Sequence, residues 1–282
     1  MSVVPVPLSV DAGPSLSVVP VFLYHSVSND APSWLAPFTV SPRTFVEHLN
    51  MIADSGLQVI PLRQLVAALH GGPPVPLRSA VLTFDDGYAD FASTVAPLLA
   101  ARGLPATLYV TTGGLRASGS GPFPSVETLS WAQVRELDAA GIEIGGHTMT
   151  HPQLDTLPRT SVREEVTGCK RQIEDALGHP VDAFAYPHGY SSRTVRAVVR
   201  EAGWTSAAAV RAASSFSSEA DDPLRFGRLM VRADTGRDRF VLWASGEGAP
   251  VAPFSESLST RGWRAYRRVR AMTGRPYRAI SA

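Results

Sequence analysis

Two adjacent carboxylates, Asp85 and Asp86, follow the apolar segment 80–84 and precede Gly87. Two neighbouring negative charges at the end of a buried strand destabilise each other unless a cation lies beside them. The pair is therefore a candidate for binding a metal ion. Because Asp-Asp-Gly is also favourable in a turn, the pair alone does not distinguish a metal site from a structural turn.

Two histidines, His147 and His151, follow a second apolar segment, 142–144. In a helical turn, a spacing of four places both rings on one face, as two ligands of one metal ion require. Such a pair also arises by chance on protein surfaces, but a carboxylate pair after another strand favours a shared metal site.

Two histidines and one carboxylate leave coordination positions open for water and substrate, which is typical of a catalytic ion. Such an ion lowers the pKa of a water molecule to about 7 and polarises a carbonyl group. Hydrolysis of an amide also needs a base for the water and an acid for the departing amine. The residues therefore favour hydrolytic chemistry.

The segments that must position these residues alternate between strand patterns and helix patterns. Strands are predicted at 18–24, 57–61, 80–84, 106–110, 142–144, 184–186, 207–210 and 228–231. Helices are predicted at 41–56, 91–101, 130–140, 159–177 and 191–201, with another near Phe240. Repeated strand–helix units predict an α/β protein with a parallel sheet, and about seven or eight strands favour a closed or nearly closed, TIM-like barrel. The polar motifs follow strand ends, where such barrels carry their sites.

Three segments resemble motifs of the polysaccharide deacetylase family, the nodulation-type chitooligosaccharide deacetylase homology domain of carbohydrate esterase family four. They are Thr83–Gly87, His147–His151 and Phe184–Gly189, and the stretch Leu129–Leu154 is also similar. The resemblance covers roughly Val21 to Val241. It implies a single domain folded as a distorted (β/α) barrel of about seven strands.

The resemblance also implies an activity, the metal-dependent removal of N-acetyl groups from a polysaccharide, oligosaccharide or glycoconjugate. Asp85 would be the general base. Asp86, His147 and His151 would bind one divalent metal ion, and zinc is the expected ion.

The third motif and the general acid depart from the usual family pattern. Tyr186, Pro187 and His188 would line the substrate groove, and a backbone N–H near His188 would help to stabilise the oxyanion. The family's acid histidine normally lies near the C-terminus, but no histidine follows His188. Leu23-Tyr24-His25 instead ends the first predicted strand, which resembles a permuted branch that deacetylates poly-N-acetylglucosamine. We therefore expect His25 to be the acid, with His188 as the competing candidate.

The arginine that often orients the base is missing from the third motif, where Ala185 occupies its place. Arg228, at the start of the last predicted strand, is a candidate for that role. The alternative interpretation is an ordinary surface arginine.

Composition limits the partners and the location. The 282 residues carry a net charge of +1, which gives no reason to expect nucleic acid as a partner. The N-terminal residues lack the pattern of a signal peptide, and no apolar run is long enough to cross a bilayer, so a cytoplasmic location is expected. We expect a flexible leader over 1–17, the barrel over 18–250 and an Arg-rich tail over 251–282.

The tail has seven arginines between Arg261 and Arg278. This charge suits contact with an anionic membrane surface or an acidic partner, and a solvated tail is the alternative.

Two other functions remain open. One is hydrolysis of a non-sugar amide, as in allantoinase-like relatives of the fold. The other is a carbohydrate-binding relative without activity, although such a protein would not need both a complete metal set and a base with its acid.

Overall fold

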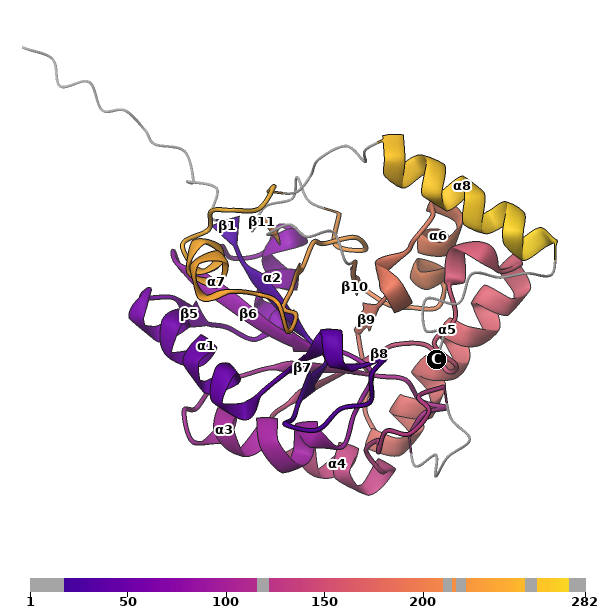
Figure 1. The fold of residues 1–282 in the computed structure, drawn as a ribbon. Helices are drawn as coiled ribbons and strands as arrows, with labels where there is room; N and C mark the ends of the chain where they lie inside the picture. Colours follow the sequence, from indigo (N-terminus) through magenta and orange to yellow (C-terminus); the bar gives the residue numbers. More distant parts are fainter. Residues whose placement is uncertain (1–17, 116–121, 210–214, 217–221, 252–257, 274–282) are drawn as a thin grey trace, which may run out of the picture.

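The computed structural model describes residues 18–115, 122–209, 215–216, 222–251 and 258–273, and there strands alternate with helices as predicted (Figure 1). The strands are β1 (Val18–Val19), β2 (Val21–Tyr24), β3 (Ser26–Val27), β4 (Thr39–Val40), β5 (Gln58–Val59), β6 (Ser79–Phe84), β7 (Thr107–Val110), β8 (Glu143–Gly146), β9 (Ala183–Ala185), β10 (Ser206–Ala208), β11 (Ser215–Phe216) and β12 (Leu229–Met230). The α-helices are α1 (Pro42–Asp54), α2 (Leu62–Leu69), α3 (Ala96–Ala100), α4 (Trp131–Ala139), α5 (Arg159–Leu177), α6 (Arg193–Glu201), α7 (Arg237–Ala244) and α8 (Leu258–Met272).

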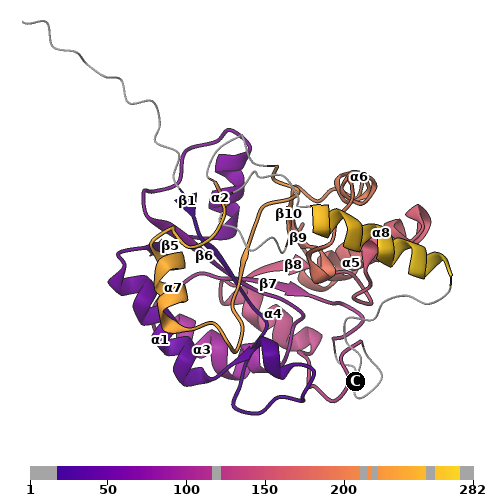
Figure 2. The same ribbon diagram turned by 45° about the horizontal axis from the view of Figure 1, so that its top comes forward.

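The central layer is a curved sheet that, in the described part of the chain, has seven parallel strands in the order β10-β9-β8-β7-β6-β2-β12. Strand β5 pairs with β6 beside this path. Helices surround the sheet on its outer side (Figures 1 and 2). The prediction of a single-domain, distorted (β/α) barrel is therefore confirmed.

A short segment between β10 and β2 nearly closes the barrel. Phe226 makes one parallel bridge to Ala208, and β12 pairs with β2 three residues later. Arg228 lies between these two pairings. Its position in the seam brings its side chain into the barrel, where its guanidinium lies 5.4 Å from the ring centroid of Tyr109.

The register of β2 against β6 brings two predicted site residues together. Tyr24 is opposite Phe84, so His25 and Asp85 follow directly after paired strand ends. The backbone N–H of Asp85 continues this pairing by donating to the carbonyl of Tyr24 at 3.0 Å.

Most local signals in the sequence act as predicted. Ser41 caps α1, Ser130 and Gln133 form a capping box on α4, and the bounds of α5 agree with the prediction. The predicted strand 18–24 is divided at Pro20, because proline has no N–H for a sheet hydrogen bond. Helix α6 begins one residue later than predicted, with Ser192 as its cap.

Close packing inside the barrel requires a glycine at position 145. A Cβ atom there would lie 2.6 Å from both the Ala183 carbonyl oxygen and the Tyr109 ring. Both contacts are too short, so any other residue would displace β8 or β9 just before the loops that carry the site.

The two ends of the chain differ in how much is described. The predicted leader, 1–17, lies outside the described residues. Within the predicted tail, residues 258–273 are described, and α8 packs against the loop around Leu154–Thr156. None of the described helices is both long enough and apolar enough to cross a bilayer.

Candidate active site

Three candidate metal ligands converge at the C-terminal edge of the sheet. Asp86 follows β6, and His147 and His151 follow β8. The Asp86 Oδ1 atom lies 3.5 Å from His147 Nε2 and 3.3 Å from His151 Nε2. One potential ligand atom from each residue lies within 4.8 Å of the other two, so all three can reach one ion.

The loop that carries the two histidines is not a helical turn, so that part of the prediction is wrong. Thr148 and His151 have φ values of 70° and 58°, in the left-handed region. Glu165 of α5 stabilises the loop by accepting hydrogen bonds from the backbone N–H groups of Met149 and Thr150. The two rings still approach to 5.0 Å between centroids, although the backbone between them is not helical.

The chemistry of these three residues fits a divalent cation. Asp86 Oδ1 is buried and has no hydrogen-bond partner among the described residues. Burial, with a contribution from Asp85, raises the pKa of Asp86 to about 6. Burial lowers the pKa of both His147 and His151, which favours the neutral rings that bind metals.

A backbone hydrogen bond fixes the orientation of the His147 ring. Its Nδ1 donates a hydrogen bond of 2.8 Å to the carbonyl of Ala185, so Nε2 points toward Asp86. Metal-binding histidines are commonly held in this way. Ala185, where the usual family pattern has an arginine, therefore contributes through its backbone.

Arg228 holds the predicted base, Asp85, in a buried ion pair. Nη1 and Nη2 of Arg228 each donate to one carboxylate oxygen of Asp85 at 2.7 Å. Burial acts to raise the pKa of Asp85, but Arg228, assisted by His147, lowers it below the ordinary value. Because Arg228 is fully buried, the interpretation of a surface arginine is wrong.

His25 lies in the same pocket as both aspartates. This pocket has a volume of about 260 Å³, and its lining includes His25, Asp85, Asp86 and His147. Nδ1 of His25 is buried without a hydrogen-bond partner among the described residues. Burial lowers the pKa of His25, while the charges of Asp86 and Asp85 oppose that change.

Of the three predicted substrate-binding residues, His188 lines the pocket. Its ring lies 4.7 Å from the ring of His151, and burial is the main cause that lowers its pKa to about 4. Tyr186 and Pro187 are buried and are not part of the pocket lining. The Tyr186 hydroxyl donates to the carbonyl of Leu224 at 2.9 Å, which is a structural role.

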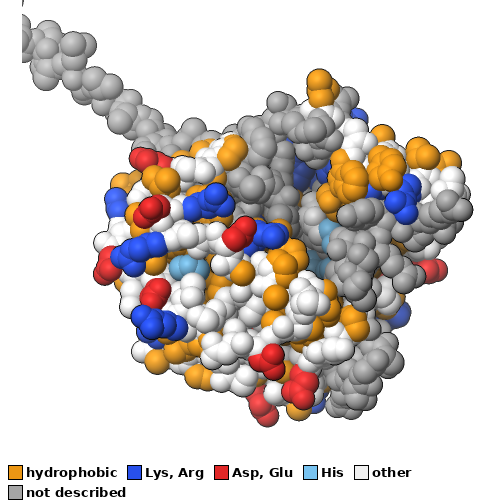
Figure 3. Space-filling view, viewed as in Figure 1, with side chains coloured by type: hydrophobic (Ala, Val, Ile, Leu, Met, Phe, Trp, Pro, Cys, Tyr) orange, Lys and Arg blue, Asp and Glu red, His pale blue; other side chains and the backbone are white. Residues whose placement is uncertain are grey.

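Aromatic and apolar side chains, including Trp34, Phe38 and Met230, line the rest of the pocket. The space-filling view shows histidine atoms at the base of a hollow in this region (Figure 3). Apolar walls with a few converging polar groups are typical of a ligand-binding site.

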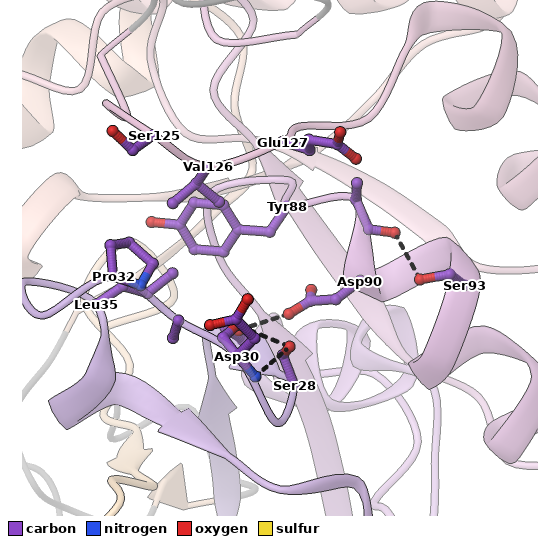
Figure 4. Close-up of a pocket in the computed structure, with 13 residues that line it drawn as sticks. Ser28, Asp30, Pro32, Leu35, Tyr88, Asp90, Ser93, Ser125, Val126 and Glu127 are labelled. Atoms are coloured by element: carbon purple, nitrogen blue, oxygen red, sulfur yellow. Dashed lines mark hydrogen bonds between the residues drawn. The ribbon is translucent and has the colours of Figure 1, made fainter.

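Tyr88 is a site residue that the sequence did not reveal. Its side chain acts to lower the pKa of Asp86, and together with Leu35 it lines both this pocket and a second one of about 530 Å³. Figure 4 shows the second pocket, with Asp30 and Asp90 on one side of the Tyr88 ring. The Asp90 carboxylate accepts from Ser26 Oγ at 2.5 Å and from the backbone N–H of Val27 at 2.9 Å.

A second buried arginine, Arg267 of α8, was also not predicted. It donates to both carboxylate oxygens of Asp155, at 3.1 and 2.8 Å, and to Gln153 at 2.9 Å. Its guanidinium carbon lies 3.5 Å from the ring centroid of Tyr190. Arg267 therefore connects the loop that follows His151 with the loop that follows His188.

One known family profile matches the segment that contains most of these residues. Residues 73–207 match the family profile described as polysaccharide deacetylase, and that segment contains Asp85, Asp86, His147 and His151. This match covers just under half of the chain. His25 and Arg228 lie outside the matched segment, so the structure alone brings them to the site.

The curated relatives are distant, and the matches span at most 60% of the length of the three relatives named here. The chain is 24% identical over 180 residues to the putative polysaccharide deacetylase YxkH of Bacillus subtilis (strain 168), a match that covers 64% of this chain and 60% of the relative. It is 28% identical over 133 residues to the poly-beta-1,6-N-acetyl-D-glucosamine N-deacetylase of Escherichia coli (strain K12), covering 44% of this chain and 20% of the relative. It is 30% identical over 128 residues to the chitooligosaccharide deacetylase of Bradyrhizobium sp. (strain ANU 289), covering 45% of this chain and 53% of the relative.

Solved structures of similar fold include the Streptococcus pyogenes deacetylase PplD in complex with acetate. It has a TM-score of 0.71 and 21% identity, and the match covers 80% of this chain and 98% of that one. IcaB from Ammonifex degensii has a TM-score of 0.71 and 22% identity, covering 81% and 97% of the two chains. At these identities the likeness establishes the barrel fold alone.

Proposed function

We propose that the protein is a metal-dependent hydrolase that removes N-acetyl groups from an N-acetylated sugar. The observation that carries the proposal is one pocket in which three residues that could bind a metal ion lie beside Asp85. Arg228 keeps the carboxylate of Asp85 ionised. Two of the curated relatives are named as deacetylases of poly-beta-1,6-N-acetyl-D-glucosamine and of chitooligosaccharide, and these names suggest the class of substrate.

Asp86, His147 and His151 would hold one divalent ion, for which zinc is the expected identity. When bound, such an ion would lower the pKa of a water molecule and polarise the carbonyl of the acetyl group. The buried, unpartnered oxygen of Asp86 and the two neutral histidine rings support this assignment.

Asp85 would take the proton from the attacking water. Arg228 keeps this carboxylate ionised at neutral pH and fixes its orientation through two hydrogen bonds. The backbone N–H of His188 is the candidate donor for the negative charge that develops on the acetyl oxygen.

His25 would donate a proton to the departing nitrogen, because an amine leaves poorly without one. The electrostatic surroundings favour His25 over His188 for this role. Burial lowers the pKa of both histidines. At His25 the carboxylates of Asp86 and Asp85 oppose this change more than Arg228 and His147 add to it, whereas at His188 the charges of His147 and Arg267 add to it.

Hydrolysis of a non-sugar amide is the second candidate function. The pocket of about 530 Å³ beside the candidate metal site favours the sugar, because its serines and carboxylates suit a polyhydroxylated chain. A carbohydrate-binding protein without activity would not need a buried arginine to keep Asp85 ionised.

Acetate release tests the proposed function. The full chain, supplied with zinc, is incubated with N-acetylglucosamine oligomers and, separately, with a non-sugar amide such as allantoin. We expect acetate from the oligomers and no cleavage of allantoin. Cleavage of allantoin alone would favour the second candidate function, and the absence of cleavage in both arms would favour the binding protein.

A matched pair of variants tests the choice of acid. His25→Ala should lower turnover of the amide by about 10²–10⁴-fold, the usual contribution of a general acid. The loss should be smaller on an activated acetate ester, whose leaving group needs no proton. His188→Ala is the control, and if it alone shows this pattern, His188 is the acid.

A further inference from the structure

Helix α8 exposes its apolar side chains and buries an arginine. Leu258, Tyr266, Val269 and Met272 are 81%, 49%, 60% and 86% exposed, whereas Arg267 is fully buried. A helix on the surface of a soluble protein normally turns its apolar face to the core and its charges to water. The two faces of α8 are arranged in the opposite way.

The buried contacts fix this orientation. Arg267 pairs with Asp155, whose side chain is also fully buried, and lies over the ring of Tyr190. On the same side of the helix, Trp263 Nε1 donates to the Tyr190 hydroxyl at 3.2 Å. Rotating the helix to bury its apolar residues would break these contacts and leave Asp155 buried without its cation.

The exposed apolar residues form one continuous stripe. At 100° per residue, positions 258, 266, 269 and 272 lie on the same face of the helix, with the exposed Gly262 and Ala265 between them. Figure 3 shows hydrophobic side chains along the outer face of α8, at the upper right of the molecule. Exposed apolar surface grouped in this way usually marks a binding surface.

The charges beside the stripe are all positive. Leu258–Met272 has five arginines and no acidic residue. Arg268 and Arg270 adjoin Val269 on either side along the helix. Arg268 also lines, together with Arg193 and the paired Asp155, a cavity of about 410 Å³ next to α8. An apolar stripe bordered by arginines is typical of helices that lie in the interface of an anionic membrane.

We propose that α8 docks the protein on an anionic membrane surface. The stripe of Leu258, Tyr266, Val269 and Met272 would enter the boundary between headgroups and acyl chains. Arg268 and Arg193 would contact the anionic headgroups. This proposal does not depend on the proposed catalytic function.

Two other occupants fit the observations less well. A second copy of the chain would bring its own Arg268 and Arg270 against those of the first copy, and like charges repel. An acidic protein would satisfy the arginines but would also need a groove for a helix that lies on the outside of the molecule (Figures 1 and 2). A membrane surface deforms around such a helix.

Vesicle sedimentation tests the proposal with the full chain. The protein is mixed with vesicles of phosphatidylcholine alone or of phosphatidylcholine with phosphatidylglycerol. We expect binding to the vesicles that contain phosphatidylglycerol, and we expect added salt to weaken it. The double variant Val269→Ser/Met272→Ser should bind about tenfold more weakly or worse, since it loses two inserted apolar side chains. Arg268→Gln should weaken binding several-fold.

Leu77→Ser is the matched control, because Leu77 is 71% exposed and lies far from α8 in the sequence. Its binding should equal that of the wild type, and thermal unfolding should show that all variants are folded. The proposal is overturned if the wild type ignores anionic vesicles or if the double variant binds them as the wild type does. It is also overturned if the stripe instead mediates a concentration-dependent dimer that the double variant abolishes.

Discussion

Two buried arginine–aspartate pairs connect the C-terminal part of the chain to the barrel, and they lie in different surroundings. Arg228 binds Asp85 with two contacts of 2.7 Å, and Arg267 binds Asp155 with contacts of 3.1 and 2.8 Å. Both arginines are fully buried. The first pair borders the candidate metal site. The second pair lies between α8 and two loops near that site.

The difference shows that a buried arginine–aspartate pair has two separate roles in this protein. Arg228 lowers the pKa of Asp85, a group that the proposed reaction needs in its ionised form. Arg267 attaches a helix and positions the loops near Tyr190 and Gln153. If this comparison is correct, breaking the first pair should impair chemistry and the whole fold, and breaking the second should act on α8.

The largest expected effect is that of Asp85→Asn. An amide cannot accept the proton of the attacking water, so acetate release should fall by about 10²–10⁴-fold while the metal is retained. The contrasting variant is Asp155→Asn, whose rate should stay within a few-fold of the wild type. Equal loss of activity in both variants, measured as kcat on N-acetylglucosamine oligomers, would contradict the division of roles.

Arg228→Met should have the largest effect on stability. It leaves the charge of Asp85 buried without a partner, which costs about 3–5 kcal/mol in the free energy of unfolding. Urea denaturation measures this loss. The double variant Arg228→Met/Asp85→Asn should regain part of it, because no unpaired charge remains. A single variant as stable as the wild type would show that Asp85 does not depend on Arg228.

Arg267→Met should cost less, roughly 1–3 kcal/mol, because α8 can detach and let water reach Asp155. Hydrogen exchange should become faster in α8 and stay slow in the barrel strands. Arg268→Met is the control, because its guanidinium Nε donates to the backbone carbonyl of Asp155 and not to the buried carboxylate. Unchanged exchange in α8 of the Arg267 variant would show that Arg267 does not attach this helix.

The smallest effect is expected from an exposed pair, His179 with Asp138. A hydrogen bond to Asp138 raises the pKa of His179, so the pair stabilises the fold below the unfolded pKa of about 6.5. This contribution is lost as the pH rises through the higher folded pKa. Since solvent screens the pair, Asp138→Asn should cost only about 0.2–1 kcal/mol at pH 6 and almost nothing at pH 9. Urea denaturation at the two pH values measures it, and a loss independent of pH would assign the effect to another contact.

Much of the fold and of the pocket could be predicted from local patterns. The capping residues Ser41 and Ser130 mark helix starts, and apolar segments mark the strands of the sheet. Because parallel strands end at a common edge, Asp86, His147 and His25 could be expected to meet there, and all three line one pocket.

Contacts distant in sequence and irregular loops could not be predicted in this way. Arg228 and Arg267 reach their partners across 143 and 112 residues. The resemblance made Arg228 a candidate, with a surface arginine as the alternative, and no local pattern pointed to Arg267. The spacing of His147 and His151 gave the correct convergence but the wrong backbone, since the backbone between them is not helical. The exposed stripe of α8 likewise depends on Arg267, which decides the face that is buried.

The most direct test of the central claim measures metal content and acetate release on the same sample of full chain, purified without chelator. We predict one divalent ion per chain, bound by Asp86, His147 and His151. A chelator should remove both the ion and the activity, and added zinc should restore both. A protein that contains no metal and releases acetate at an unchanged rate in the presence of chelator would contradict the account.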